Sequence, residues 1–342
     1  MSLTEYSPGD VLTASSLNAN LAFAASSSNT NVIINGAMQV AQRGTSTASI
    51  TGATFGGADR WKASPSAMGT WTQSVENDAP TGSGLRKSSK MLCTTADASP
   101  AANDHVVFVT ALEGQNVQQF LKGTSSAKQF SLSFWVKSNV TGTYIANLYD
   151  NDNTRWCSAS YSISASATWE KKTITLPADT TGQFDNDNDN SLVLHMFLGA
   201  GSTYTSGTLA TTWNANAFAN ANIAVGQTNL AAATSNYWQI TGVQLEVGSV
   251  ATPFEFEDIS TTLAKCFRYF ERLETTMQLG NGGGSNNTWV FWSFKARKRA
   301  TPTYTTTGAQ TGSGVGIDNV WAFRSGGNDV SMVAGDTASA EL

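Results

Sequence analysis

Aromatic residues set among polar neighbours are the residues of this chain whose types and spacing best suit the binding of sugars. Segment 130–137 reads FSLSFWVK, in which apolar and polar residues alternate. Because successive strand residues point to opposite faces of a sheet, Trp135 and Lys137 fall on the face opposite the four apolar residues. A tryptophan ring there can stack on a sugar, or it can be buried under a sheet cover or in a subunit interface. Trp135 and Lys137 are therefore candidate glycan-binding residues, with burial of Trp135 as the competing interpretation.

A second pair of aromatic residues flanks a polar loop. Tyr149 precedes and Trp156 follows the segment 150–154, which reads DNDNT. Rings at the ends of such a loop would combine apolar surface with nearby hydrogen-bonding groups, as binding sites for small ligands do. Tyr149 and Trp156 are therefore predicted to bind glycan at a loop tip.

Other aromatic residues and one histidine have a structural interpretation. Trp61, Trp169 and Trp238 are predicted to lie in the core. His195 shares its predicted strand face with two apolar residues, so it is predicted to be a buried histidine with satisfied hydrogen bonds rather than a ligand.

Alternating acids suggest a possible metal site. Segment 185–190 reads DNDNDN, in which Asp185, Asp187 and Asp189 could bind calcium through side-chain oxygens. Asp150 and Asp152 form a similar, shorter pair. The segment lacks the glycine at its sixth position and the glutamate at its twelfth that a calcium loop has. A polar turn without metal is the alternative, so the only cofactor predicted is a possible structural calcium.

Catalysis is not predicted. His105 and His195 are the only histidines, and neither lies near a serine or cysteine in a recognisable nucleophile motif. A glycosidase needs two carboxylates across a sugar bond, whereas the clustered acids here lie in Asn-rich loops where they would stay solvated. The chain is therefore predicted not to be an enzyme.

Composition excludes several classes of protein. Charged residues make up 13% of the 342 residues and the net charge is −5, which argues against nucleic-acid binding. A basic cluster at 295–299 beside Trp289, Phe291 and Trp292 leaves room for an anionic polysaccharide. Three distant cysteines form neither a disulfide framework nor a zinc motif. No signal peptide and no membrane-spanning apolar run are predicted.

Short alternating strands separated by turns predict a mainly β fold. The chain is rich in Ser, Thr, Asn and Gly, which weaken helices, and it contains 30 glycines. Strands are predicted within 130–137, 144–148, 174–176, 192–198 and 237–247. The last one changes phase near Gly242, which predicts a β-bulge. Many such strands favour a jelly-roll sandwich of two sheets.

The chain divides into four predicted parts. Residues 1–30 form an N-terminal segment with a short helix and a Ser/Asn linker, and residues 31–258 form the jelly roll. Leu263, Phe267 and Phe270 recur at helical spacing, which predicts a connecting helix over 259–277. Residues 278–342 then form a small C-terminal β domain.

Several motifs, in this order along the chain, resemble a family of phage tail-fibre proteins. They are NVIING at 31–36, QVAQRG at 39–44, ADRW at 58–61, WQITGVQLEVG at 238–248, ATPFE at 251–255, LAKCFRYFE at 263–271, RATPT at 299–303 and ASAEL at 338–342. The opening GDVLTA at 9–14, followed by Leu17 and Asn18, is similar to a virion-attachment segment. The resemblance covers most of the chain.

The resemblance implies a tail fibre or receptor-binding protein of a bacteriophage or prophage. It implies a jelly roll like that of carbohydrate-binding modules, a homotrimer, and attachment to other virion tail proteins through residues 1–30. The expected ligand is polysaccharide or lipopolysaccharide on the host surface, and the expected location is the virion tail, after synthesis in the host cytoplasm. The alternative is a purely structural fibre or adaptor, such as a head fibre or docking platform. A polysaccharide depolymerase is a further alternative.

Overall fold

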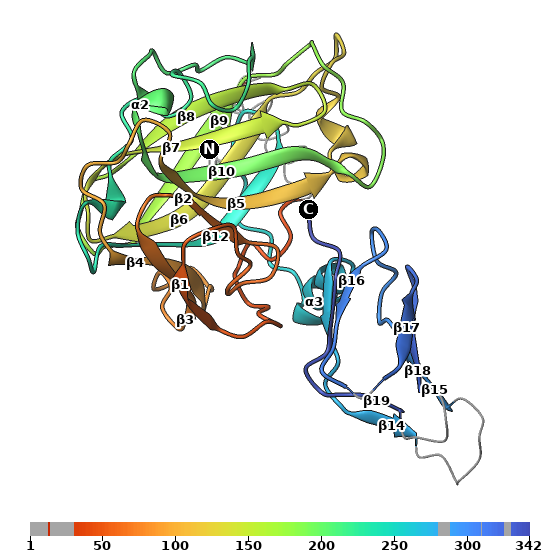
Figure 1. Cartoon of the computed structure of the whole chain (residues 1–342). Coiled ribbons are helices and arrows are strands. Elements are labelled where there is room, and N and C mark those ends of the chain that lie inside the picture. The colour runs from red at the N-terminus through yellow and green to blue at the C-terminus, as the bar shows by residue number, and fades with distance from the viewer. Residues whose placement is uncertain (1–12, 14–30, 280–287, 309, 325–329) are drawn as a thin grey trace, which may run out of the picture.

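The alternating segments pair into two six-stranded antiparallel sheets, which pack face to face as a jelly-roll β-sandwich (Figure 1). The protein is represented by a computed structural model that describes residue 13 and residues 31–279, 288–308, 310–324 and 330–342. Apart from Thr13, the predicted attachment segment 1–30 lies outside the described residues. The mainly β fold class is confirmed.

Sheet A forms one layer of the sandwich. In spatial order, it consists of β1 (Ser46–Ile50), β3 (Thr70–Glu76), β4 (Ser88–Thr95), β12 (Tyr237–Val247), β6 (Phe130–Ser138) and β9 (Glu170–Leu176). Sheet B forms the other layer. It consists of β11 (Asn214–Ala215), β8 (Arg155–Ile163), β7 (Gly142–Asp150), β10 (Asn190–Ala200), β5 (His105–Glu113) and β2 (Lys62–Ser66).

The core lies between the inner faces of the two sheets. Phe130, Leu132, Phe134 and Val136 of β6 are fully buried there, as their alternation predicts. The predicted core tryptophans Trp61 and Trp238 are also fully buried. The Phe108 ring lies between them, stacked on Trp61 at 5.1 Å and edge-on to Trp238 at 5.8 Å between ring centroids.

Strand β12 contains the predicted bulge. Its pairing with β6 shifts register between Thr241 and Gln244. Gly242 has a φ of +61°, which a residue with a side chain rarely adopts. A β-carbon there would also lie 2.8 Å from Leu85 Cδ1, so both the backbone and the space require glycine.

Helices are few among the described residues. Short turns form η1 (Gly114–Asn116), η2 (Gln118–Phe120), α2 (Ser202–Thr205) and η3 (Leu230–Ala232), and α3 spans Ile259–Phe267. No described helix is both long enough and apolar enough to cross a membrane. The helix predicted over 259–277 is shorter than expected, because α3 already ends at Phe267. Phe270 keeps the helical spacing in sequence, but its backbone pairs with Ser339, and this strand pairing replaces the helix after residue 267.

Three small antiparallel sheets follow α3 and lie beside the sandwich (Figure 1). One consists of β13 (Phe270–Arg272), β20 (Thr337–Ser339) and β16 (Thr303–Thr305), and a second of β14 (Met277–Leu279) and β19 (Val330–Met332). The third, which we call sheet E, consists of β15 (Thr288–Ser293), β18 (Asn319–Arg324) and β17 (Gly312–Val315). By this pairing, residues 270–279 belong to the C-terminal sheets.

Buried charges join the C-terminal sheets to the sandwich. Arg60, which is 2% exposed, pairs with Glu341, and its guanidinium lies 3.5 Å from the centroid of the Tyr269 ring. Arg268 binds both carboxylate oxygens of Glu113 at 2.7 Å. Such two-point arginine–carboxylate pairs fix orientation as well as distance. The junction is therefore a specific interface rather than a loose linker.

Candidate functional site

The outer face of sheet B carries an apolar cluster of its own, separate from the main core. Trp156, Ile145 and Phe197 point outward from their strands into this cluster. The long excursion of the chain over residues 201–226, between β10 and β12, covers them with Tyr204 and Ile223. The excursion covers one part of the face and leaves the rest open.

A groove of about 250 Å³ occupies the open part of this face. It crosses β2, β5, β10 and the end of β7. Its lining consists of Lys62, Ser64, His105, Val107, Val109, Ala111, Tyr149, Asn151, Asn190, Val193, His195, Phe218 and Leu342. Apolar strand residues thus form the floor, with rings, amides and one ammonium group among them.

Three rings gather along one side of the groove. Phe218, from the covering excursion, lies 4.7 Å from His195 and 5.9 Å from Tyr149 between ring centroids. Tyr149 and Phe218 are nearly perpendicular, at 87°. Each ring is partly exposed. An edge-to-face arrangement of this kind is favourable for aromatic rings and holds them in place.

Hydrogen bonding fixes the protonation of His195. The amide nitrogen of Asn147 donates to Cys157 O at 3.2 Å and to Ser158 Oγ at 3.0 Å, so its oxygen faces His195 Nδ1 at 3.3 Å. The proton therefore lies on Nδ1, and Nε2 is left as an acceptor. Burial, together with the smaller effect of the charges of Lys62 and His105, lowers the pKa of His195 to about 3. The imidazole is neutral at ordinary pH.

One polar atom in the groove lining has no partner. The side-chain oxygen of Asn190 is buried and accepts no hydrogen bond from the described residues. Its backbone oxygen, in contrast, accepts from Asn151 Nδ2 at 3.0 Å. A buried acceptor left unpaired costs about 1–3 kcal/mol, so such atoms call for a donor from water or a ligand.

The groove offers surfaces for binding rather than groups for bond cleavage. No aspartate or glutamate is among its described lining residues. A pair of acids placed across a sugar bond, which a glycosidase requires, is therefore not supplied there. Ring faces, amide groups, a neutral imidazole and an ammonium group can hold a polyhydroxylated ligand.

The structure separates the four predicted glycan-binding residues. Tyr149 lines the groove, as a binding role requires. Trp156 is fully buried in the outer cluster of sheet B, so its prediction as an exposed loop-tip residue is wrong. It is the second residue of β8 rather than the end of a loop, and the excursion over residues 201–226 covers it. The sequence around Trp156 gives no sign of this distant cover.

Trp135 and Lys137 lie on the outer face of sheet A, on the other side of the sandwich from the groove. Lys137 forms an ion pair with Asp78, and its ammonium nitrogen lies 5.1 Å from the centroid of the Trp169 ring. Trp135 is half-buried and flanks Gly242 together with Leu85. The cation is thus already engaged by the chain's own groups.

Trp169 is not a core residue, contrary to prediction. It is half-buried and donates from Nε1 to Asp78 Oδ1 at 3.2 Å. Burial alone would raise the pKa of Asp78, but hydrogen bonds from Lys137, Trp169 and Gln239 outweigh burial and hold it below its usual value. Trp169 comes directly before β9, where strand alternation does not yet fix the side of the sheet.

The predicted calcium ligands do not converge. Asp187 uses Oδ1 to accept from the backbone of Asp189 at 2.9 Å, and Asp189 pairs with Arg299 at 3.3 Å. Asp150 is fully buried against Lys122, and Asp152 accepts from the backbone of Asp185 at 3.0 Å. In the part of the chain that the structure describes, no three acidic, histidine or cysteine side chains could hold a metal together. This geometry does not fit a calcium loop.

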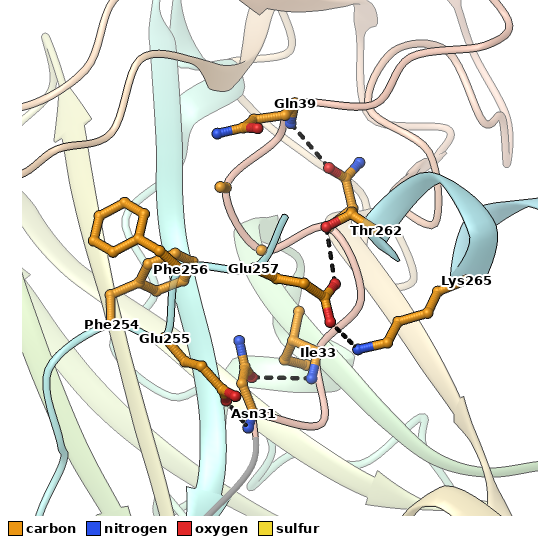
Figure 2. A pocket seen from close by; sticks show the side chains of 12 residues that line it. Asn31, Ile33, Gln39, Phe254, Glu255, Phe256, Glu257, Thr262 and Lys265 are labelled. Carbon is orange, nitrogen blue, oxygen red and sulfur yellow. Dashed lines mark hydrogen bonds and ion pairs between the residues drawn. The ribbon is translucent and has the colours of Figure 1, made fainter. Parts of the chain in front are cut away.

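A second pocket, of only about 40 Å³, lies where the described chain enters the sandwich (Figure 2). Figure 2 shows Glu257 turned toward Thr262 and Lys265; Thr262 Oγ1 donates to it at 2.8 Å and Lys265 forms an ion pair with it. Glu255 accepts from the backbone of Asn31 at 2.8 Å. Because these polar groups satisfy one another and the space is small, we do not assign a ligand to this pocket.

Sequence reasoning missed three residues of the groove. His195 was predicted to be a buried histidine, but it is half-buried and lines the groove. Asn190 ends the DNDNDN segment, which was interpreted only as a possible metal site, and Phe218 lies in an Asn- and Ala-rich segment without a distinctive pattern. For His195, the sequence offers one pattern, its alternation with Val193 and Phe197, which places the three residues on the same strand face.

Comparison with known proteins gives structural likenesses only. No protein-family model and no curated protein sequence matches this chain. A putative sugar-binding protein from Bacteroides thetaiotaomicron has a TM-score of 0.35 at 13% identity, over 64% of this chain and 100% of that one. A family 11 carbohydrate-binding module from Clostridium thermocellum, in complex with a mixed-linked tetrasaccharide, has a TM-score of 0.29 at 11% identity, over 61% and 98%.

The enzymatically active domain of tailspike protein 4 of bacteriophage CBA120 has a TM-score of 0.33 at 14% identity, over 64% of this chain. The match spans only 21% of the length of that tailspike chain. At these identities and TM-scores, none of the likenesses carries an argument about what this chain binds.

Proposed function

We propose that this chain is a glycan-binding tail fibre of a bacteriophage or prophage, which holds host-surface polysaccharide or lipopolysaccharide during adsorption. The groove on sheet B is the proposed binding site. The observation that carries the proposal is the gathering of three partly exposed rings in one groove. The virion role is supported by the motifs that resemble phage tail-fibre proteins.

The chemistry of the groove suits a sugar chain. The apolar face of a sugar ring can pack on Tyr149 or Phe218, because such a face has C–H groups and no hydroxyls. Sugar hydroxyls can donate to His195 Nε2 and can accept from Lys62. Since His195 is neutral, it serves as an acceptor without attracting or repelling charge.

Assembly forms the second part of the proposal. Residues 1–30 attach the chain to other virion tail proteins, and the working form is a homotrimer. A trimer would present three grooves, and linked sites strengthen binding to a repetitive polysaccharide through effective concentration. Sedimentation of the full chain tests this, since a stable monomer at micromolar concentration would rule out the trimer.

Affinity electrophoresis in gels that contain host lipopolysaccharide or capsular polysaccharide tests the binding role. We expect the full chain to be retarded, and Tyr149→Ala to migrate faster than the parent. Phe256→Ala is the matched control, because Phe256 is exposed but distant from the groove lining. Absence of retardation by any host polysaccharide would favour the purely structural fibre or adaptor, and release of reducing sugar would favour a depolymerase.

A further inference from the structure

The outer face of sheet E carries four aromatic rings in two directly opposed cross-strand pairs. Trp289 of β15 faces Phe323 of β18, and Phe291 faces Trp321. We call these four residues the aromatic platform. Trp289 is 41% exposed and Phe291 is 61% exposed. The other face of the sheet is buried, with Val290, Trp292, Val320 and Ala322 in the C-terminal core. The platform is therefore not needed to form that core.

Two glycines on the neighbouring strand β17 let rings of the platform lie low on the sheet. A β-carbon at Gly314 would lie 2.2 Å from Cζ2 of Trp321, and one at Gly312 would lie 2.8 Å from Cε1 of Phe323. The two rings thus occupy the space that side chains on β17 would fill. Trp289 packs against both, at 5.2 Å from Trp321 and 4.8 Å from Phe323 between ring centroids. Three of the four rings thus pack on one another, and Phe291 lies beside them opposite Trp321.

The chemistry around the platform is neutral. The next cross-strand pair on the same face is Ser293 and Asn319, and both residues are exposed. Of the described residues that alternate onto this face of sheet E, none is charged. In the nearby basic cluster, Arg297 is exposed and Lys295 pairs with Glu274, but both follow the end of β15 and do not belong to the strand residues of this face. Lys298 is buried in a pair with Glu271, and Arg299 donates to the backbone oxygens of Ala340 and Glu341 at the junction.

The size of the platform argues against a second copy of the chain as its occupant. Six residues of strand at about 3.3 Å each, across three strands about 4.8 Å apart, cover roughly 200 Å². A stable protein interface needs about 800 Å² from each partner. Aromatic rings bordered by a hydroxyl and an amide instead match the alternating apolar faces and hydroxyl groups of a saccharide. Because the strand residues of this face carry no charge, the platform itself favours a neutral sugar over an acidic one.

We propose that the aromatic platform is a second saccharide site, which binds a neutral glycan chain by stacking, with Ser293 and Asn319 as hydrogen-bonding groups at one end. The site goes beyond the proposed function, since it lies on the C-terminal sheets and shares no residue with the groove. It would bind even if the groove bound nothing.

Affinity electrophoresis of the full chain in neutral polysaccharides tests this proposal, with xylan, mannan and dextran as probes. The parent is a variant whose groove has been disabled by Tyr149→Ala and Phe218→Ala, so that failure of the groove and of the platform can be told apart. We expect at least one probe to retard this parent. Adding Trp289→Ala and Phe291→Ala should weaken that binding roughly 30-fold, if each ring contributes as other aromatic contacts do.

A finer variant separates ring geometry from ring number. Gly314→Ser keeps every aromatic residue but displaces Trp321, so it should also weaken binding while near-ultraviolet circular dichroism reports that the C-terminal domain is folded. Phe256→Ala is the control and should leave migration unchanged. Three results would overturn the proposal: no retardation by any of the neutral probes, retardation that does not depend on the platform, or a fall in sedimenting mass on Trp289→Ala and Phe291→Ala. The last would identify a subunit interface.

Discussion

The two outer faces of the sandwich arise from the same strand alternation, yet they use their polar groups differently. On sheet A, Lys137 is paired with Asp78, which also accepts from Trp169. On sheet B, the oxygen of Asn190 is left unpaired among described residues beside three partly exposed rings. A tryptophan two residues from a lysine in sequence therefore says little about binding, because an acid from a distant part of the same chain can engage the lysine.

The largest effect should come from removing two rings of the groove. Tyr149→Ala combined with Phe218→Ala should weaken glycan binding roughly 30-fold, since each aromatic contact contributes about 1 kcal/mol. Isothermal titration with the oligosaccharide of the host polysaccharide measures this. Equal affinity of the double variant and the parent would move the site away from sheet B.

The next effect is on the pH dependence of folding stability, to which His195 on the outer face of sheet B contributes. The folded-state pKa of His195 is about 3, below its unfolded value of 6.5, so the unfolded chain binds an extra proton between these values. His195 therefore destabilises the fold as pH falls from 6.5 toward 3. His195→Gln should remove this part of the acid loss, so that its melting temperature falls less than that of the parent over the same range. Parallel melting curves at each pH would show that His195 is not buried as a neutral base.

Trp135→Ala tests the opposite face with a smaller expected effect. Because Trp135 flanks Gly242 and Leu85 away from the groove, we expect less than a twofold change in glycan affinity. The thermal midpoint, measured in parallel, reports any loss of packing. A loss of binding larger than that of the groove variant, at unchanged stability, would place the glycan on Trp135 and Lys137 instead.

The smallest effect should follow from Asp78→Asn. The Asp78 side chain is 42% exposed, so solvent screens its pair with Lys137 and the loss of stability should be at most about 0.5 kcal/mol. Since the folded-state pKa of Asp78 is below its unfolded value of 3.8, this contribution is present above pH 3.8 and is lost at lower pH. Urea unfolding at pH 7 and pH 3 measures both parts. A loss at pH 3 as large as the loss at pH 7 would assign the effect to packing.

Strand alternation predicted the fold better than it predicted the site. The inward residues of β6 and the bulge at Gly242 follow from local pattern alone, because side-chain period and glycine backbone freedom are properties of a few adjacent residues. The groove depends on the excursion over residues 201–226, which buries Trp156 and brings Phe218 beside His195. Such contacts join segments distant in sequence. The end of α3 is another case, since pairing between Phe270 and Ser339 overrides local helical spacing.

The junction of the C-terminal sheets with the sandwich has a mechanical consequence. The chain crosses the junction at residues 268–269, and Ala340 donates back to Tyr269 while Glu341 is held by Arg60. The C-terminal sheets are thus joined to the sandwich by the chain itself and, separately, by these two contacts of the last residues. The Arg60–Glu341 ion pair should therefore resist rotation of the C-terminal sheets against the sandwich. Because that pair is buried, dissolved salt screens it little. The position of the C-terminal sheets against the sandwich should therefore change little over a wide range of ionic strength.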